Sequence, residues 1–407
     1  MTVSPNPPSR AQTRGSRTPP TIATLIILAG VAVTAMNIFL PVLPEISSDL
    51  GVSPAVGQYV LTLFLAATGF AQLFIGPLSD RYGRRPVILW SIVVFIFGTL
   101  VCIFAPNIEV LLIGRLLQAT SAACIALSRA VIRDLYDRTK AASMIGYVTM
   151  AMAVMPMLAP SLGGFIGENY GWRATFFVLL LMALGMLLLT WFDLGETHEP
   201  RKEPVRALVA DYFSLTKEPV FWGYVATSSL SSGAYFAFLG GAPFVGVDII
   251  GLGPGVLGVY FGLVAIGYMA GNFISGRYSQ RIGIEPMMFY GGLVACLGVV
   301  ITLFLMASFT PQAGYLFYPM LLVGLGNGMV LPNANAGAVS VRPELAGSAS
   351  GIAGFIQIGG GAALASLAGS LITVENQAMP LYVIMFLSSL GGALVAAIMY
   401  FRARAQR

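Results

Sequence analysis

Charged residues are scarce in this chain of 407 residues: Asp, Glu, Lys and Arg together make up only 10%, whereas apolar residues make up 57%. A soluble domain usually carries about 25% charged residues, because its surface faces water. The low charge and the mean hydropathy of +0.82 therefore exclude an ordinary soluble fold. Together they are typical of a helical protein that crosses the membrane several times.

Residues that carry out catalysis or bind metals are equally scarce. The chain has one histidine, His198, and its three cysteines show no metal-ligand spacing (Cys102, Cys124 and Cys296). No Asp or Glu falls in the middle of a long apolar run. Because an enzyme needs a nucleophile, a metal or an acid–base cluster, we predict no enzymatic activity, no cofactor and no metal site. We interpret the cysteines as small core residues.

Long apolar runs occupy most of the sequence. A helix needs about 20 apolar residues to cross a bilayer, and twelve runs reach that length. We therefore predict an all-α membrane protein with twelve transmembrane helices. The runs lie at 22–44, 56–76, 86–105, 110–132, 142–165, 174–194, 221–244, 255–276, 285–307, 314–334, 348–372 and 379–401.

The longest polar interval, 195–219, separates the first six runs from the last six. We predict two six-helix bundles, at 21–194 and 220–402, with this interval as a cytoplasmic linker. The first twenty residues are rich in Pro, Ser and Arg and have few apolar side chains, so we expect 1–20 to be a disordered cytoplasmic tail. Residues 403–407 form a second, short tail.

The distribution of basic residues predicts the orientation in the membrane. Lys and Arg lie almost wholly in segments that we assign to the cytoplasm, and Arg173 is the exception. Because basic residues accumulate in cytoplasmic loops, we expect both termini on the cytoplasmic side of the inner membrane. The net charge of +5 follows from the same asymmetry and indicates the lipid bilayer as a partner, not a nucleic acid.

A charged turn, which we call the latch, follows the second apolar run. Its glycines permit a tight turn, and its arginines can pair with acids across the interface between the bundles. Such a segment holds the cytoplasmic side closed in one conformation; alternatively, it only sets the topology. The latch residues are Gly76, Asp80, Arg81, Gly83, Arg84 and Arg85.

The two halves of the sequence resemble each other. The segment 276–283 follows the eighth run as the latch follows the second, with Gln280 in the place of Asp80. Weak similarity between six-helix halves is typical of internally duplicated transporters. Since Gln280 carries no charge, we expect the latch to act on one side only.

The fifth run combines helix-breaking and small residues. It contains Pro156 and Pro160, followed by Gly163 and Gly164. Proline removes a helix hydrogen bond, and glycine lets a neighbouring backbone approach closely. We therefore predict a kinked and closely packed helix.

Arg115 is the residue whose position is most costly, because an arginine inside a membrane helix costs at least about 2.5 kcal/mol. Either it faces a polar cavity, where it can bind an anionic or carbonyl group, or it snorkels to the outer surface. For Arg129 the same two interpretations stand. Polar groups in otherwise apolar runs are the candidate substrate-cavity residues: Asn37, Arg115, Gln118, Tyr235, Asn327, Asn333 and Gln357.

With these motifs, the chain from about residue 21 onward resembles the major facilitator superfamily. The latch matches the signature of the first intracellular loop in that superfamily. Within it, the segments 37–41, 115–118, 128–134 and 159–164 resemble the twelve-span drug:proton antiporters of the Bcr/CflA type, named for bicyclomycin and chloramphenicol resistance.

This resemblance implies a monomeric secondary transporter that exports small amphipathic compounds by alternating access, with protons as the coupling ion. The alternative is a facilitator or symporter for a specific small metabolite. The Bcr/CflA family commonly has an aspartate in the first helix, at the position of Asn37. Because an amide cannot titrate, proton coupling rests on the resemblance alone. Glu45 and Asp248, which follow the first and seventh apolar runs at the membrane boundary, are the remaining candidates for a proton carrier.

Overall fold

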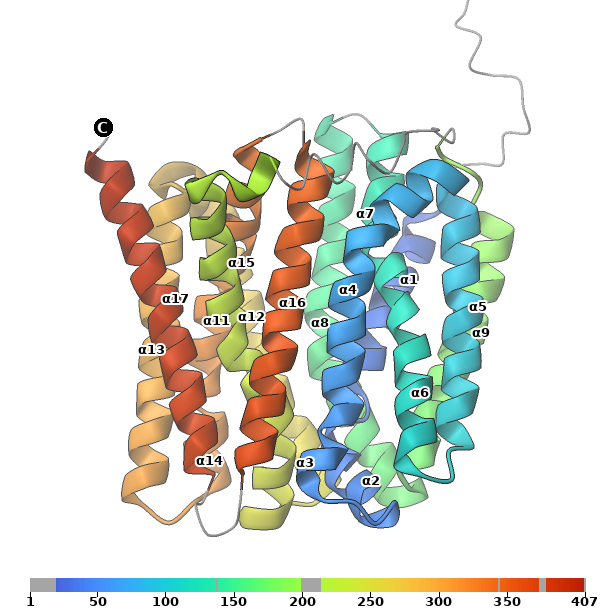
Figure 1. The fold of residues 1–407 in the computed structure, drawn as a ribbon, viewed down its shortest axis with the longest axis vertical. Helices are drawn as coiled ribbons and strands as arrows, with labels where there is room; N and C mark the ends of the chain where they lie inside the picture. The colour runs from blue at the N-terminus through green and yellow to red at the C-terminus, as the bar shows by residue number, and fades with distance from the viewer. Residues whose placement is uncertain (1–19, 137, 199–213, 343–344, 373–377, 406–407) are drawn as a thin grey trace, which may run out of the picture.

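The computed structural model is a long bundle of helices, without strands in the parts of the chain that it describes (Figure 1). These parts are residues 20–136, 138–198, 214–342, 345–372 and 378–405. The predicted first tail therefore lies outside the described residues except for residue 20, as do most of the predicted linker and residues 406–407.

The first half of the chain forms helices α1 to α9. Two of its spanning segments are broken by short 3-10 turns, after Asn37 and after Gln118. The elements are α1 (Ile22–Asn37), η2 (Leu40–Val42), α2 (Leu43–Asp49), α3 (Pro54–Gly57), α4 (Tyr59–Tyr82), α5 (Arg84–Ile103), α6 (Ile108–Gln118), η3 (Ala119–Ser121), α7 (Ala122–Leu135), α8 (Arg138–Tyr170) and α9 (Trp172–Asp193).

The second half begins again with a long helix after the polar interval. Its elements are α11 (Pro219–Phe244), η4 (Val245–Ile249), α12 (Pro254–Ile282), α13 (Ile284–Ser308), α14 (Ala313–Phe317), α15 (Met320–Ser340), α16 (Ala346–Leu371) and α17 (Met379–Ala405).

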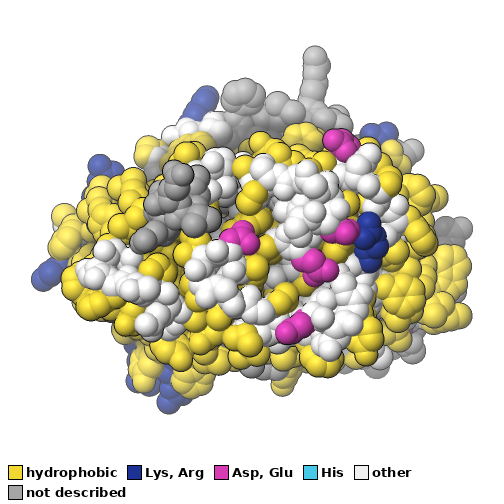
Figure 2. All heavy atoms as spheres, turned by 90° about the horizontal axis from the view of Figure 1, so that it is seen from below, with side chains coloured by type: hydrophobic (Ala, Val, Ile, Leu, Met, Phe, Trp, Pro, Cys, Tyr) yellow, Lys and Arg dark blue, Asp and Glu magenta, His cyan; other side chains and the backbone are white. Residues whose placement is uncertain are grey.

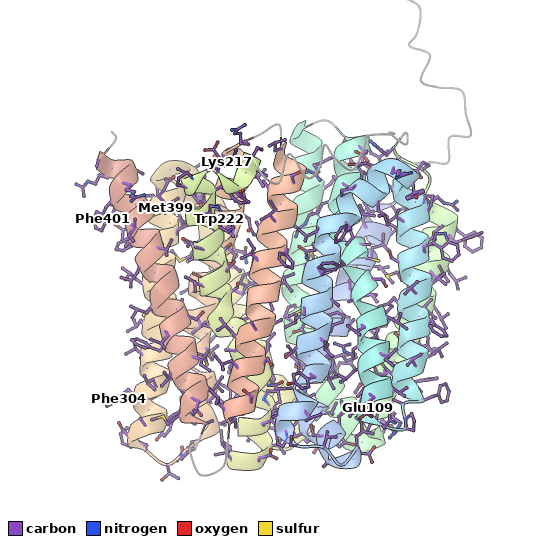
Figure 3. All side chains as sticks on the ribbon, in the orientation of Figure 1. Glu109, Lys217, Trp222, Phe304, Met399 and Phe401 are labelled. Atoms are coloured by element: carbon purple, nitrogen blue, oxygen red, sulfur yellow. The ribbon has the colours of Figure 1, made fainter. Side chains whose placement is uncertain are left out.

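The predicted all-α membrane fold is confirmed. Among the described residues, eleven helical segments are long and apolar enough to cross a membrane, and each coincides with one predicted run. The remaining run, 142–165, lies within the 33-residue helix α8. Large apolar side chains on the outside, such as Phe304 and Phe401, point away from the bundle (Figure 3) and are 61% and 56% exposed, as expected for contact with lipid.

The two halves lie side by side and meet along two helix pairs, α4 with α16 and α8 with α12 (Figure 1). The turn between α4 and α5 and the end of α17 lie at one end of the bundle, which we call the latch end. The short helices α2, α3 and α14 lie at the opposite end, which we call the far end.

The backbone repeats the internal similarity of the sequence. Gly83 ends α4 with φ 94°, and Gly283 ends α12 with φ 101°, a conformation that side chains other than glycine rarely adopt. Each glycine donates its N–H, at 2.9 Å, to the carbonyl of a serine four residues earlier, Ser79 or Ser279. The same turn therefore connects corresponding helices in the two halves.

Helices α12 and α15 pack backbone against backbone. A Cβ atom on Gly324 would overlap the carbonyl oxygen of Val264, and one on Gly328 would overlap that of Tyr268. Small residues at such positions let helices approach, and in lipid this close packing is a main source of helix association. The glycines of α15 thus serve the packing of α15 against α12.

We expect Gly324→Ala to lower the thermal stability of the purified protein by the equivalent of about 1–3 kcal/mol, because the two helices must move apart. The matched control is Gly276→Ala, since a Cβ at Gly276 meets no atom within 4 Å and the gain in helix propensity is the same. Equal melting temperatures of the two variants in detergent would contradict this account.

Candidate functional site

Arg115 lies at the centre of the first half and is completely buried, with 0% exposure. Its Nε donates to the carbonyl of Val60 at 2.9 Å, and its Nη1 donates to the carbonyl of Ala35 at 3.1 Å. The rings of Phe39 and Phe64 lie 4.2 Å from the guanidinium carbon, within the range of cation–π attraction. Arg115 therefore does not snorkel to the surface, and it ties α6 to α1 and α4.

Gln118 extends this hydrogen-bond network to α5. Its side-chain oxygen accepts from Arg115 Nη1 at 2.5 Å, and its amide donates to the hydroxyl of Thr99 at 2.8 Å. The other terminal nitrogen of Arg115, Nη2, is buried without a hydrogen-bond partner among the described residues. The network thus leaves the N–H groups of Nη2 unused in this conformation.

The asparagines among the candidate residues are buried. Asn37 is 2% exposed; its amide donates to the carbonyl of Val33 at 2.8 Å, and its oxygen is enclosed without a partner. On α15, Asn333 donates to the hydroxyl of Ser275 on α12 at 2.8 Å, and Asn327 is 3% exposed. In this conformation the structure thus places Asn333 between two helices of its own half.

Tyr235 and Gln357 differ from the asparagines because both side chains keep accessible area. The ring of Tyr235 lies beside that of Phe236, with 5.9 Å between the ring centroids.

Arg129 on α7 has fewer hydrogen-bond partners than Arg115. Its Nη2 lies 3.6 Å from the sulfur of Met152 on α8, and its Nε is buried without a hydrogen-bond partner among the described residues. Arg115, in contrast, is enclosed by contacts within its own half.

The latch forms a charged network at the end of α4. The buried Arg84 bridges two acids: Nη1 lies 2.6 Å from Asp80, and Nε lies 3.0 Å from Asp134 of α7. It also donates to the hydroxyl of Ser79. Glu196 accepts from the backbone N–H of Arg84 at 2.9 Å, so the network also holds the segment after α9.

These partners lie in the first half of the chain, except Glu196, which lies at the start of the predicted linker. Arg85 likewise donates to the carbonyls of Leu194 and Trp191, at 2.7 and 3.1 Å. Asp80 remains 50% exposed. Pairing of these arginines across the two halves, as expected from the sequence, stays a prediction for another conformation.

The far end is where hydrogen bonds join the halves. Gln58, which is fully buried between α3 and α4, donates to the carbonyl of Gly240 on α11. Ser161 of α8 donates to the carbonyl of Gly258 on α12 at 3.1 Å. Glu168 accepts from the backbone N–H of Gly255 at 3.0 Å and so caps the N-terminus of α12, where a negative charge is favourable.

The sequence analysis missed Gln58 and Glu168. Gln58 is a polar group at the start of an apolar run, which was the available signal. Glu168 stands in a short polar stretch near the end of α8, and the sequence has many such stretches.

The segment of α8 that we predicted to be kinked has Pro156 and Pro160 inside a continuous helix. A Cβ on Gly163 would overlap the carbonyl of Ile38, and one on Gly164 that of Pro254.

Charge is divided between the two ends of the molecule. Figure 2 shows the far-end face, where several acidic side chains lie near one basic side chain. Glu109 lies at this end and Lys217 at the latch end (Figure 3). The only arginine that the sequence analysis assigned to the outside, Arg173, pairs at 2.8 Å with Asp49 at the far end.

Comparison with known proteins places this architecture in a family. The Major Facilitator Superfamily matches residues 25–365. The uncharacterized MFS-type transporter YdgK of Bacillus subtilis is 31% identical over 366 residues, which cover 88% of this chain and 90% of the relative. A bicyclomycin resistance protein homolog of Haemophilus influenzae is 30% identical over 358 residues, covering 86% and 89%.

More distant similarity agrees with the fold. Multidrug resistance protein D of Escherichia coli is 29% identical over 349 residues, covering 85% of this chain and 88% of the relative. The crystal structure of a bacterial homolog of the human lysosomal transporter Spinster, inward-facing and occupied, matches 94% of this chain and 96% of that one with a TM-score of 0.69 at 15% identity. The chain therefore belongs to the major facilitator superfamily, and within it to the Bcr/CflA type.

Proposed function

We propose that this protein exports small amphipathic compounds, including drugs, from the cytoplasm by alternating access. The observation that carries the proposal is the pairing of two similar halves along α4–α16 and α8–α12, with hydrogen bonds between them at the far end. The names of relatives support the cargo: they include a chloramphenicol resistance protein of Pseudomonas aeruginosa and multidrug resistance proteins.

The proposed orientation places the latch end in the cytoplasm of a bacterial inner membrane, with both termini on that side. Arginines crowd at this end, at the latch and at the ends of α12 and α17, where Asp80 and Asp134 pair with Arg84, whereas the far-end face carries several acids beside one basic side chain. Basic segments remain in the cytoplasm during insertion. The two bundles, 21–194 and 220–402, then act as the moving halves of a monomer, with 195–219 as their linker.

In this orientation, the structure corresponds to a state that is closed toward the outside. Gln58, Ser161 and Glu168 join the halves there, whereas among the described residues the latch binds its own half and the start of the linker. We propose that the latch engages the second half when the far end opens. Asp80, which is half exposed, is the group available for that contact.

The chain departs from the family pattern of proton coupling at Asn37. Asn37 cannot carry a proton, and the acids of the described helices lie near helix ends. We propose that any coupled proton binds a boundary acid, Glu45 or Asp248. The second candidate function, a facilitator or symporter for a specific metabolite, is favoured by this lack of a carboxylate in the membrane interior.

A susceptibility panel tests the proposed export. We expect cells without the gene to become several-fold more sensitive to a subset of amphipathic antibiotics, and a plasmid copy to restore resistance. The matched control is the empty plasmid. If no compound distinguishes the strains while cells with the gene take up one metabolite faster, the second candidate function is correct.

We expect Arg115→Ala to lose transport and thermal stability together. The change removes the side chain that joins α6 to α1 and α4, and it leaves the buried side-chain oxygen of Gln118 without its donor, at about 1–3 kcal/mol for an unsatisfied group. Arg115→Lys should restore little of either property, because a lysine cannot reproduce the guanidinium fork. Melting temperature and efflux are measured against Arg277→Ala, which removes an exposed arginine. Normal efflux by Arg115→Ala would refute this role.

We expect export by the Asn37→Asp variant to depend more strongly on an imposed pH gradient than export by the wild type, since a carboxyl group can carry a proton and an amide cannot. The measurement is substrate flux in proteoliposomes, with the membrane potential clamped. Asn169→Asp, which adds an acid at an exposed position, is the control. Strong pH-gradient drive in the wild type that survives removal of both Glu45 and Asp248 would contradict the proposal.

A further inference from the structure

A groove of about 310 Å³ lies at the latch end of the second half, between the start of α13 and the end of α17. These two helices are neighbours in the bundle (Figure 1). The lining of the groove includes Glu285 and Tyr290 of α13 and Tyr400 and Arg404 of α17. Neither helix belongs to the pairs α4–α16 and α8–α12 that join the halves, so the groove is separate from the interface that is proposed to move.

Two opposite charges line this groove without pairing. The carboxylate of Glu285 accepts from the phenol of Tyr224 on α11 at 2.7 Å, which leaves most of its acceptor capacity unused. Arg404 is exposed, and among the described residues it forms no ion pair with Glu285 or with another acid. At the same end of the bundle, Arg342 and Glu218 do pair, at 2.9 Å. The groove thus keeps a cation and an anion apart, and each can bind a group of opposite charge.

Aromatic rings of the two helices pack together beside the groove. The ring of Phe289 stacks on that of Tyr400, with 5.3 Å between the centroids and 7° between the planes. The ring of Tyr290 lies 5.4 Å from that of Phe289. Tyrosine is enriched at the boundary between hydrocarbon and headgroups, because its ring is apolar and its hydroxyl prefers water. Tyr290 and Tyr400 therefore indicate that the groove lies at the depth of the lipid headgroups.

Apolar side chains continue from the groove along the outer side of both helices. On α13, Leu293 and Leu297 follow Tyr290 at a spacing that keeps all three on one helix face, and the leucines are 48% and 53% exposed. On α17, Leu394 and Ile398 are 55% and 53% exposed. This surface offers contacts for an acyl chain next to the two charges of the groove.

We propose that the groove binds a phospholipid whose headgroup carries both a phosphate and a primary ammonium group. Arg404 donates to the phosphate oxygens, and Glu285 accepts from the ammonium group, so both hydrogen bonds are charge-assisted. Tyr290 and Tyr400 lie beside the glycerol part of the lipid, and one acyl chain lies along Leu293 and Leu297.

The pair of charges selects this headgroup over two others. A glycerol headgroup has no cation, so it would leave Glu285 beside a net negative charge. A choline headgroup has a cation without N–H groups, so it cannot donate to the carboxylate. A soluble zwitterion such as an amino acid could satisfy both charges, but it would leave the apolar surface at Leu293 and Leu297 uncovered.

The test measures the binding of the first lipid to the purified full-length protein in detergent by native mass spectrometry. The probes are phosphatidylethanolamine, phosphatidylcholine and phosphatidylglycerol with identical acyl chains. We expect the Kd for phosphatidylethanolamine to be about fivefold lower than the Kd for either of the others, because only its headgroup satisfies both charges.

Two variants separate the two charges. Glu285→Gln keeps an acceptor for Tyr224 and removes the negative charge, so the Kd for phosphatidylethanolamine should come within about twofold of that for phosphatidylcholine. Arg404→Gln should raise the Kd for all three lipids several-fold, because the phosphate is common to them. Arg133→Gln is the matched control, since it removes an exposed arginine at the end of α7, and it should leave each Kd unchanged.

Three results would overturn the proposal: equal Kd values for the three lipids, tightest binding of phosphatidylglycerol, or an unchanged Kd for phosphatidylethanolamine in Arg404→Gln. Equal values would mean that the groove holds ordinary surrounding lipid, and a preference for phosphatidylglycerol would mean attraction by net positive charge alone. Melting temperatures in lipid-free detergent verify folding, and Arg404→Gln should match the wild type because its side chain is exposed. The proposed export is tested separately, by the susceptibility panel.

Discussion

The absence of water in the lipid core is the constraint on which the structure of this protein depends. A polar group inside the membrane must find its partners within the protein, because each unsatisfied group there costs several kcal/mol. The chain meets this demand with helices throughout the described residues and with acids confined to the neighbourhood of helix ends. Two arginines nevertheless lie inside helices. Arg115 is hydrogen-bonded to backbone carbonyls of α1 and α4 and to Gln118, whereas the Nε of Arg129 has no hydrogen-bond partner among the described residues.

The same constraint explains why the fold could be predicted from the sequence. Spanning length and low charge appear directly as apolar runs, so the helices lie where those runs predicted them. The turn at Gly83 could also be predicted, because its charges interrupt two runs and its glycine permits the positive φ. These features are local, and each is determined by the residues of one segment.

The site could be predicted only in part, because its geometry depends on contacts between distant segments. The acceptors around Arg115 include the backbone carbonyls of Ala35 and Val60. Every residue has a backbone carbonyl, so the residue types do not reveal which ones accept. Glu168 caps a helix that begins 86 residues later, at Pro254. Gln58 was overlooked because its partner, the carbonyl of Gly240, lies 182 residues further along the chain.

The division of hydrogen bonds between and within the halves links structure to movement. Gln58, Ser161 and Glu168 join the halves, so their hydrogen bonds must break when the halves separate at the far end. Only a contact that differs between the arrangements of the halves can bias a conformational equilibrium. The partners of Arg115 all lie in the first half, so Arg115 stabilises that half as a unit while the halves move.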